Sequence, residues 1–186
     1  MPRVGISPAQ VASSVRWALV SAPRGHLSAL TGQVARALAK RAAAVAGFLQ
    51  AREGEAQSLV RVATGERVAL SRPSSTPAAG EEPFCSVVVR PDAFPLARRW
   101  LEEDGPGAAV WVLDGLSKLE ASGRGHLDTV RWALAHAGGR PVVLGVRADQ
   151  LFDVMGVLGL EHEPLAALEN DADPAAVERF VDAVLA

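Results

Sequence analysis

The sequence predicts one three-layer α/β domain, in which helices cover both faces of a mostly parallel sheet. Short apolar runs alternate with segments of helical spacing, as they do where crossover helices join parallel strands. The run at 108–113 is apolar at every position, which is typical of a central strand buried on both faces. Apolar residues make up 49% of the 186 residues, enough for a core without a metal or disulfide. We expect residues 1–15 to form a leader and residues 16–186 to form the domain.

Apolar runs and turn residues define the elements of the first half. The first run stops at a stretch containing Pro23 and Gly25, which predicts a strand followed by a turn. Two further runs flank Gly65, which predicts an inserted β-hairpin. Residues 73–83 are rich in Pro, Ser and Gly, so we expect a mobile loop. The predicted elements are a strand at 17–20, a helix at 28–44, a strand at 45–49, the hairpin at 55–72, the loop at 73–83 and a strand at 87–89.

Helix caps and two apolar runs define the second half. Asp92 precedes a helical pattern that the stretch 104–107 ends, and Asp173 with Pro174 begins the last helix. The predicted elements are a helix at 94–101, a strand at 108–113, a loop up to 125, a helix at 127–135, a strand at 141–146, a short helix at 149–158, an edge segment at 165–169 and a final helix from 174. Ligands bind beyond the carboxyl ends of parallel strands. We therefore expect the site at the strand exits 21–28, 114–124 and 147–150.

Composition and charge argue against several functions. The formal net charge is −2, so no basic excess neutralises a nucleic-acid backbone, and we expect no nucleic-acid partner. We find no signal peptide and no apolar run long enough for a membrane span, and we expect a cytoplasmic protein. The single cysteine, Cys85, permits no internal disulfide and is expected to be a small buried residue. His136 and His162 stand apart from other ligand types, so we expect no zinc site.

The turn after the first strand occupies the place of a phosphate-binding P-loop but lacks most of its residues. A P-loop reads G-x-x-x-x-G-K-[ST]: the glycines wrap the phosphates, the lysine neutralises their charge and the hydroxyl holds Mg²⁺. The chain reads S-A-P-R-G-H-L-S at this place. Ser21 and His26 take the glycine positions and Leu27 takes the lysine position, so only the Ser28 hydroxyl remains. We expect Leu27 to pack down and close the pocket.

Asp114 ends the strongest apolar strand, where a Walker B aspartate would hold the Mg²⁺ water shell. An aspartate that caps the following turn fits this position equally well. Gly115 follows, so a catalytic carboxylate directly after the aspartate is missing. We expect no cofactor other than Mg²⁺, which Ser28 and Asp114 would bind only together with a nucleotide. If the site is active, Asp114 and Lys118 are the candidate catalytic residues.

The order of these segments resembles the THEP-type nucleoside-triphosphatases. That family has Gly-Phe after its first helix, matched by Gly47 and Phe48, and D-E-x-G-K-M-E after the Walker B strand, whose Lys and Glu match Lys118 and Glu120. The stretches 45–50, 63–67 and 116–125 are closer to a sister group with G-K-x-E-A-x-G-x-G after the strand. That group is often encoded near molybdate transporters, which hints at oxyanion biology. The resemblance covers roughly residues 16–150 and implies a P-loop fold whose phosphate loop is degenerate.

Arginines and a lysine near the strand exits are candidates for binding an anion. Arg24, Gly25 and His26 form either an anion-binding nest at a helix N-terminus or an ordinary turn. Lys118 and Glu120 form either a site pair or an exposed surface ion pair. Arg124 either clamps a ligand or belongs to a connecting loop, and Arg147 either lines a cleft or pairs with Asp149. The candidate ligand-binding residues are Ser21, Arg24, Gly25, His26, Ser28, Lys118, Glu120, Arg124 and Arg147.

Three functions fit these residues. The first is a non-catalytic P-loop-like domain that acts as a binding, scaffold or regulatory protein with a protein partner, because the lysine and both loop glycines are missing. The second is an unconventional Mg²⁺-dependent nucleoside triphosphatase, in which Arg24 or Lys118 replaces the missing charge. The third is a protein that binds a small oxyanion, molybdate or phosphate, at residues 24–28.

Overall fold

The computed structural model describes residues 15–41, 44–170 and 173–186. Most of the predicted leader therefore lies outside the described residues. The strands are β1 (Trp17–Ala22), β2 (Val45–Glu53), β3 (Ala56–Arg61), β4 (Arg67–Pro73), β5 (Glu82–Phe84), β6 (Val87–Val89), β7 (Val110–Leu116), β8 (Val142–Arg147) and β9 (Ala167–Glu169). The helices are α2 (Leu27–Lys40), α3 (Ala93–Asp104), α4 (Lys118–Ala121), α5 (Leu127–His136), α6 (Leu151–Leu158) and α7 (Pro174–Leu185), with 3₁₀ turns at Gly105–Gly107 and Ala148–Gln150.

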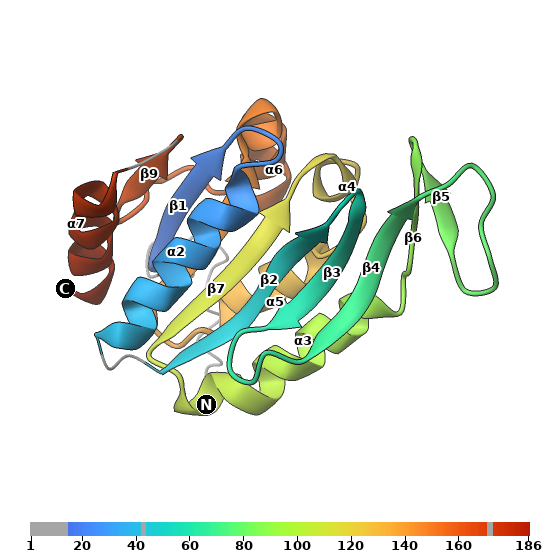
Figure 1. Cartoon of the computed structure of the whole chain (residues 1–186). Helices are drawn as coiled ribbons and strands as arrows, with labels where there is room; N and C mark the ends of the chain where they lie inside the picture. The colour runs from blue at the N-terminus through green and yellow to red at the C-terminus, as the bar shows by residue number, and fades with distance from the viewer. Residues whose placement is uncertain (1–14, 42–43, 171–172) are drawn as a thin grey trace, which may run out of the picture.

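The described strands form one nine-stranded mixed sheet in the order β5-β6-β4-β3-β2-β7-β8-β1-β9 (Figure 1). One half of the sheet, β2-β7-β8-β1-β9, is parallel. The other half, β5-β6-β4-β3-β2, is antiparallel, so β2 belongs to both halves. The predicted α/β class with helices on both faces is confirmed. The predicted hairpin extends the sheet into an antiparallel half, so the sheet is less parallel than predicted.

Two hydrophobic clusters lie on opposite faces of the sheet. Because successive strand residues point to opposite faces, Ala18 and Val20 of β1 face one cluster and Trp17 and Leu19 face the other. Helices α2 and α7 cover the first face, and α3, α5 and α6 cover the second (Figure 1). The two-faced burial explains why the central strands read as continuous apolar runs.

Several predicted boundaries differ from the structure. The predicted loop up to Gly125 contains α4, because Ser117 and Glu120 form a capping box that begins a short helix. Strand β5 begins inside the predicted loop 73–83, where Glu82, Pro83 and Phe84 pair with β6. None of the described helices is long and apolar enough to span a membrane.

Candidate functional site

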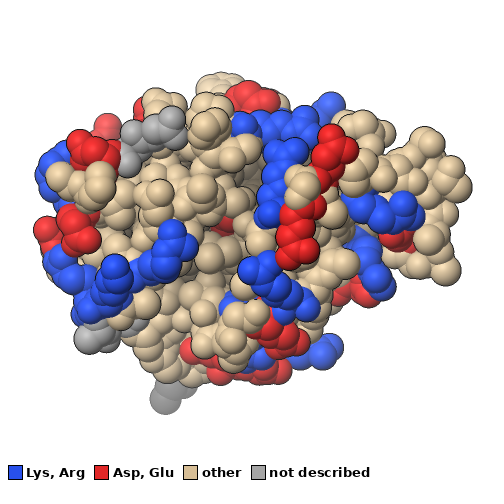
Figure 2. Space-filling view, in the orientation of Figure 1, with Lys and Arg blue, Asp and Glu red and all other residues tan. Residues whose placement is uncertain are grey.

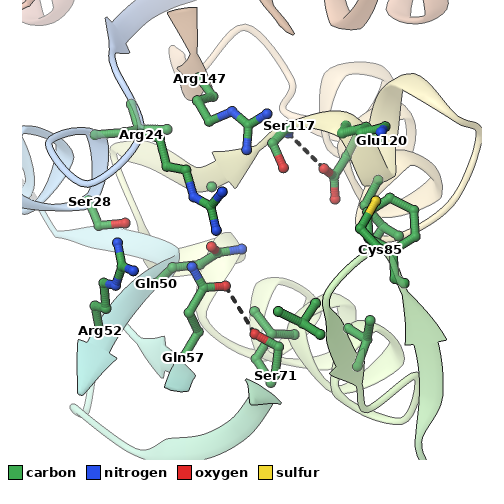
Figure 3. Close-up of a pocket in the computed structure, with 18 of the residues that line it drawn as sticks. Arg24, Ser28, Gln50, Arg52, Gln57, Ser71, Cys85, Ser117, Glu120 and Arg147 are labelled. Atoms are coloured by element: carbon green, nitrogen blue, oxygen red, sulfur yellow. Dashed lines mark hydrogen bonds between the residues drawn. The ribbon is translucent and has the colours of Figure 1, made fainter. Parts of the chain in front are cut away.

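A cavity of about 360 Å³ opens at the carboxyl ends of the parallel strands (Figure 3). This volume lies in the range typical of small-molecule sites. The turn after β1, the ends of β2, β7 and β8, and helix α4 form one side of the cavity. Strands β3 and β4 and the β5–β6 hairpin form the other side. The cavity therefore lies where the fold class places ligands, and the inserted antiparallel strands enclose it.

Basic side chains dominate the charge of the cavity. Arg24, Arg52, Lys118 and Arg147 line it, whereas Glu55 and Glu120 are its acidic residues. The guanidinium groups of Arg24, Arg52 and Arg147 point toward one open space (Figure 3). Figure 2 shows Lys and Arg side chains gathered at this edge of the molecule, with acidic side chains beside them. The cavity is therefore suited to an anionic ligand.

The three arginines differ in the hydrogen bonds and ion pairs that their side chains already form. Arg147 donates two hydrogen bonds to the Asp149 carboxylate, with Nη2–Oδ2 at 2.9 Å, so it both lines the cavity and forms the predicted pair. Arg52 donates from Nε to the carbonyl oxygen of Gly54 at 3.0 Å. Within residues 15–41, 44–170 and 173–186, Arg24 has neither a hydrogen-bond nor an ion-pair partner. Arg24 is therefore the arginine best placed to bind an added anion.

Residues 21–28, which the sequence predicts to be a degenerate P-loop and which we call the P-loop segment, lead directly into α2. Gly25 adopts a positive φ of 90°, a conformation that favours glycine, and it lines the cavity together with Ser28. Leu27 is 6% exposed and packs into the hydrophobic cluster under α2 and α7. The predicted packing of Leu27 is confirmed, but the predicted closure of the pocket is wrong, because the cavity remains open above it.

Two candidates of this segment lie outside the cavity. His26 is exposed and is not among the residues that line the cavity. Ser21 is buried within β1, where its carbonyl oxygen accepts a hydrogen bond from the backbone N–H of Asn170. The structure thus brings Arg24, Gly25 and Ser28 into the cavity and leaves Ser21 and His26 out of it.

Asp114 is fully buried in β7, next to Gly115, which lines the cavity. Its Oδ2 accepts a hydrogen bond from the backbone N–H of Gln50 at 3.0 Å, which ties β7 to β2. Its Oδ1 has no hydrogen-bond partner in the described part of the chain. Burial raises the pKa of the carboxyl from 3.8 to about 6, against the opposing effects of the Gln50 N–H and of the Thr31 and Ser28 hydroxyls, which lie near the carboxyl without forming a hydrogen bond to Oδ1. Asp114 is thus a shielded group that does not line the cavity.

Replacing Asp114 with asparagine should change how stability depends on pH. A carboxyl whose pKa is higher in the folded chain than in the unfolded chain contributes its full stabilisation at pH values below the unfolded pKa. This contribution is lost as the pH rises through the folded pKa of about 6. Between pH 5 and pH 8 the free energy of unfolding of the wild type should therefore fall by about 1.4 kcal/mol relative to that of Asp114→Asn. Urea unfolding at both pH values measures this difference. Asp128→Asn, at a side chain 95% exposed, is the control, and an identical pH slope in Asp114→Asn and wild type would contradict the assignment.

Glu120 has a structural role that the sequence did not predict. Its carboxylate accepts hydrogen bonds from the backbone N–H of Ser117 at 2.8 Å and of His126 at 2.9 Å. Burial raises its pKa to about 7, although both N–H groups oppose the rise. Of the two alternatives for Lys118 and Glu120, the exposed surface ion pair is wrong, because Glu120 is buried and faces backbone donors. Both residues nevertheless line the cavity, with Lys118 exposed at its rim.

Two expectations at the β5–β6 hairpin also change. Arg124 lies beside this hairpin, with Nη2 2.8 Å from the Glu82 carboxylate, and is not among the cavity-lining residues. The prediction that Cys85 is buried is wrong, because it occupies the exposed turn between β5 and β6 with a φ of 54°. Its backbone position at a hairpin turn, rather than its side-chain type, determines its exposure.

Sequence patterns missed several residues of the cavity. Gln50, Arg52, Gln57 and Ser71 lie on β2, β3 and β4, far from the P-loop segment in sequence. The sequence signal was the polar character of these positions at strand ends, which alone does not show the direction they face. His126 was also missed as a core residue: it is fully buried and stacks on Phe48 with ring centroids 4.2 Å apart.

Metal-binding clusters are absent from the described residues, in which no group of three His, Cys, Asp or Glu could hold a metal. Ser28 and Asp114 lie close enough for the Ser28 hydroxyl to lower the pKa of the carboxyl. Hydroxyl and carboxylate oxygens suit Mg²⁺, but the cation would need to reach a carboxylate that is 0% exposed. The pair therefore fits Mg²⁺ by its chemistry and not by its access.

Comparison with known proteins agrees with the fold. The family described as "Protein of unknown function (DUF2478)" matches residues 17–172. The crystal structure of THEP1 from the hyperthermophile Aquifex aeolicus is similar with a TM-score of 0.64 and 17% sequence identity, over 91% of this chain and 96% of that chain. No curated protein matches the sequence. At this identity the structural likeness establishes a P-loop-NTPase-like fold and nothing finer.

Proposed function

The chain belongs to the DUF2478 family, and from this membership and the geometry of its cavity we propose that it binds a phosphate-bearing ligand, foremost a nucleotide, without hydrolysing it. The observation that carries the proposal is the set of cations lining one cavity at the carboxyl ends of the strands. Arg24, Arg52 and Arg147 come from three different strands or turns and point into the same space (Figure 3). Guanidinium groups bind phosphate through two parallel hydrogen bonds, so side chains replace the charge that Leu27 cannot supply.

We expect no hydrolysis because of the positions of Leu27 and Asp114. Phosphoryl transfer depends on charge placed at the transferred group and on a held Mg²⁺ ion. Leu27 is buried in the core at the lysine position. Asp114 is shielded, and the side-chain amide of Gln50 lies against Gly115, with its Cδ 2.1 Å from where an added Cβ would be. Gln50 therefore occupies the space in which a carboxylate after Asp114 would act.

Two other functions remain as alternatives. The proximity of Ser28 to Asp114 favours a Mg²⁺-dependent triphosphatase, should the carboxylate become accessible when a nucleotide binds. Gly25 and Arg24 at the start of α2 favour a small oxyanion site. A protein partner that senses the bound state remains a prediction from the degenerate phosphate loop.

Calorimetric titration of Arg24→Gln with ADP tests the proposal. Arg24 is exposed and without a described partner, so its replacement should leave the fold intact. Loss of one charged hydrogen bond costs about 1.5–3 kcal/mol, so the Kd for ADP should rise roughly 10- to 150-fold. Arg179→Gln on α7, an exposed arginine outside the cavity, is the control and should bind as the wild type does.

Parallel assays with ATP and Mg²⁺ separate the alternatives. We expect binding without release of phosphate. Turnover that disappears in Asp114→Asn would establish the triphosphatase instead. Equal affinities of Arg24→Gln and wild type, or no binding of any nucleotide, would overturn the proposed site.

A further inference from the structure

The cavity has an apolar wall opposite its arginines. Leu70 of β4 and Val89 of β6 are buried at this wall, and Phe84 of β5 and Phe94 of α3 complete it. The four side chains also belong to the hydrophobic cluster on the α3 and α5 face, so the core behind them holds the wall in place. The wall is therefore a preformed surface, which reduces the entropy lost when a ligand packs against it.

Aromatic contacts fix the two phenylalanines of the wall. The Phe94 ring meets the His126 ring edge to face, with centroids 4.8 Å apart. The Arg124 guanidinium lies over the Phe84 ring, 5.6 Å from its centroid, and an ion pair joins Arg124 to Glu82 on the same strand. Both rings are thus oriented by neighbours outside the cavity, and they can pack against a flat group without rearranging.

A polar pair lies between the arginines and the apolar wall. The Ser71 hydroxyl donates a hydrogen bond to Oε1 of Gln57 at 3.2 Å (Figure 3). The pair orients the Gln57 amide so that its NH₂ group is the end left to donate hydrogen bonds. The cavity therefore offers a neutral hydrogen-bond donor in addition to its cations.

From this two-sided lining we infer that the ligand is an amphipathic organic anion, with its phosphate between the arginines and an unsaturated ring against Leu70, Phe84, Val89 and Phe94. The inference rests on the proposed function and specifies its ligand class. A bare oxyanion would contact the arginines and leave the half-buried rings of Phe84 and Phe94 in water, forgoing the gain from their burial. The antiparallel insert is then the part of the chain that selects the ligand, and the P-loop side binds its charge.

Titration with two matched probes tests this assignment. Inorganic diphosphate carries the charge alone, and 1-naphthyl phosphate adds a flat apolar group. We expect 1-naphthyl phosphate to bind at least tenfold more tightly than diphosphate despite its lower charge. Phe84→Ala should remove most of this difference and leave the Kd for diphosphate unchanged. Phe152→Ala, at a phenylalanine 89% exposed on α6, is the control and should change neither Kd.

The results of these titrations distinguish the apolar wall as a ring-binding surface from the anion site of the proposed function. Diphosphate that binds as tightly as 1-naphthyl phosphate, or a Phe84→Ala variant that binds both as the wild type does, would overturn the inference and leave the anion site standing. If neither probe binds, and Arg24→Gln binds ADP with the same Kd as the wild type, the proposed anion site itself is overturned. Phe84→Leu keeps an apolar side chain and should retain part of the preference, and thermal unfolding verifies that each variant is folded.

Discussion

Gly47→Ala is expected to destabilise the protein by about 4 kcal/mol or more, enough to unfold a domain of ordinary stability. A Cβ at this position would lie 1.9 Å from the carbonyl oxygen of Val112 on β7, with which Gly47 pairs. The φ of Gly47 is 125°, which adds backbone strain for any other residue. Strands β2 and β7 join the antiparallel half of the sheet to the parallel half, so separating them affects both.

Urea unfolding followed by tryptophan fluorescence measures the effect of this change. Gly156→Ala on α6 is the matched control, because an added Cβ there meets no atom within 4 Å and alanine favours helices. The control should be as stable as the wild type or up to about 1 kcal/mol more stable. A Gly47→Ala variant within about 1 kcal/mol of the wild type would show that β2 and β7 do not pack as closely as the structure has them.

His126→Phe is expected to become increasingly more stable than the wild type as the pH falls. The imidazole is fully buried between Phe48 and Phe94, and neither of its nitrogens has a hydrogen-bond partner in the described part of the chain. Burial lowers its pKa from 6.5 to about 3. Below pH 6.5 the imidazole of the unfolded chain is protonated, whereas that of the folded chain stays neutral down to about pH 3. The stability that the neutral imidazole contributes above pH 6.5 is therefore lost as the pH falls below this value.

Unfolding free energies at pH 7.5 and pH 4.5 provide the test. The two pH units between 6.5 and 4.5 correspond to ~2.7 kcal/mol, which the wild type should lose relative to His126→Phe. A phenylalanine keeps the stacking and the backbone N–H that donates to Glu120. His136→Phe, at an exposed histidine that stacks on Trp132, is the control and should not show this widening. A constant difference between His126→Phe and wild type across the pH range would mean that the imidazole is protonated or hydrated in the fold.

Residue spacing predicted the fold more completely than the site. The apolar runs at 108–113 and 141–146 became β7 and β8, because strands buried on both faces have a composition that local sequence displays. Arg52 and Gln57 could not be assigned to the cavity, because only the pairing of β2 with both β3 and β7 brings them beside the turn after β1. The exposure of Cys85 follows from its place in a hairpin turn, which composition does not report.

The sequence by itself determined the α/β class, the turn between the first strand and the helix that follows it, and the apolar residue at position 27. These properties depend on local order along the chain: apolar periodicity, turn residues and the residue type at one position. Only the tertiary structure decided that Asp114 is shielded by burial, that Glu120 caps backbone N–H groups, and that arginines and an apolar wall share one cavity. These properties depend on strand order and register, which place residues distant in sequence within contact and control their access to water.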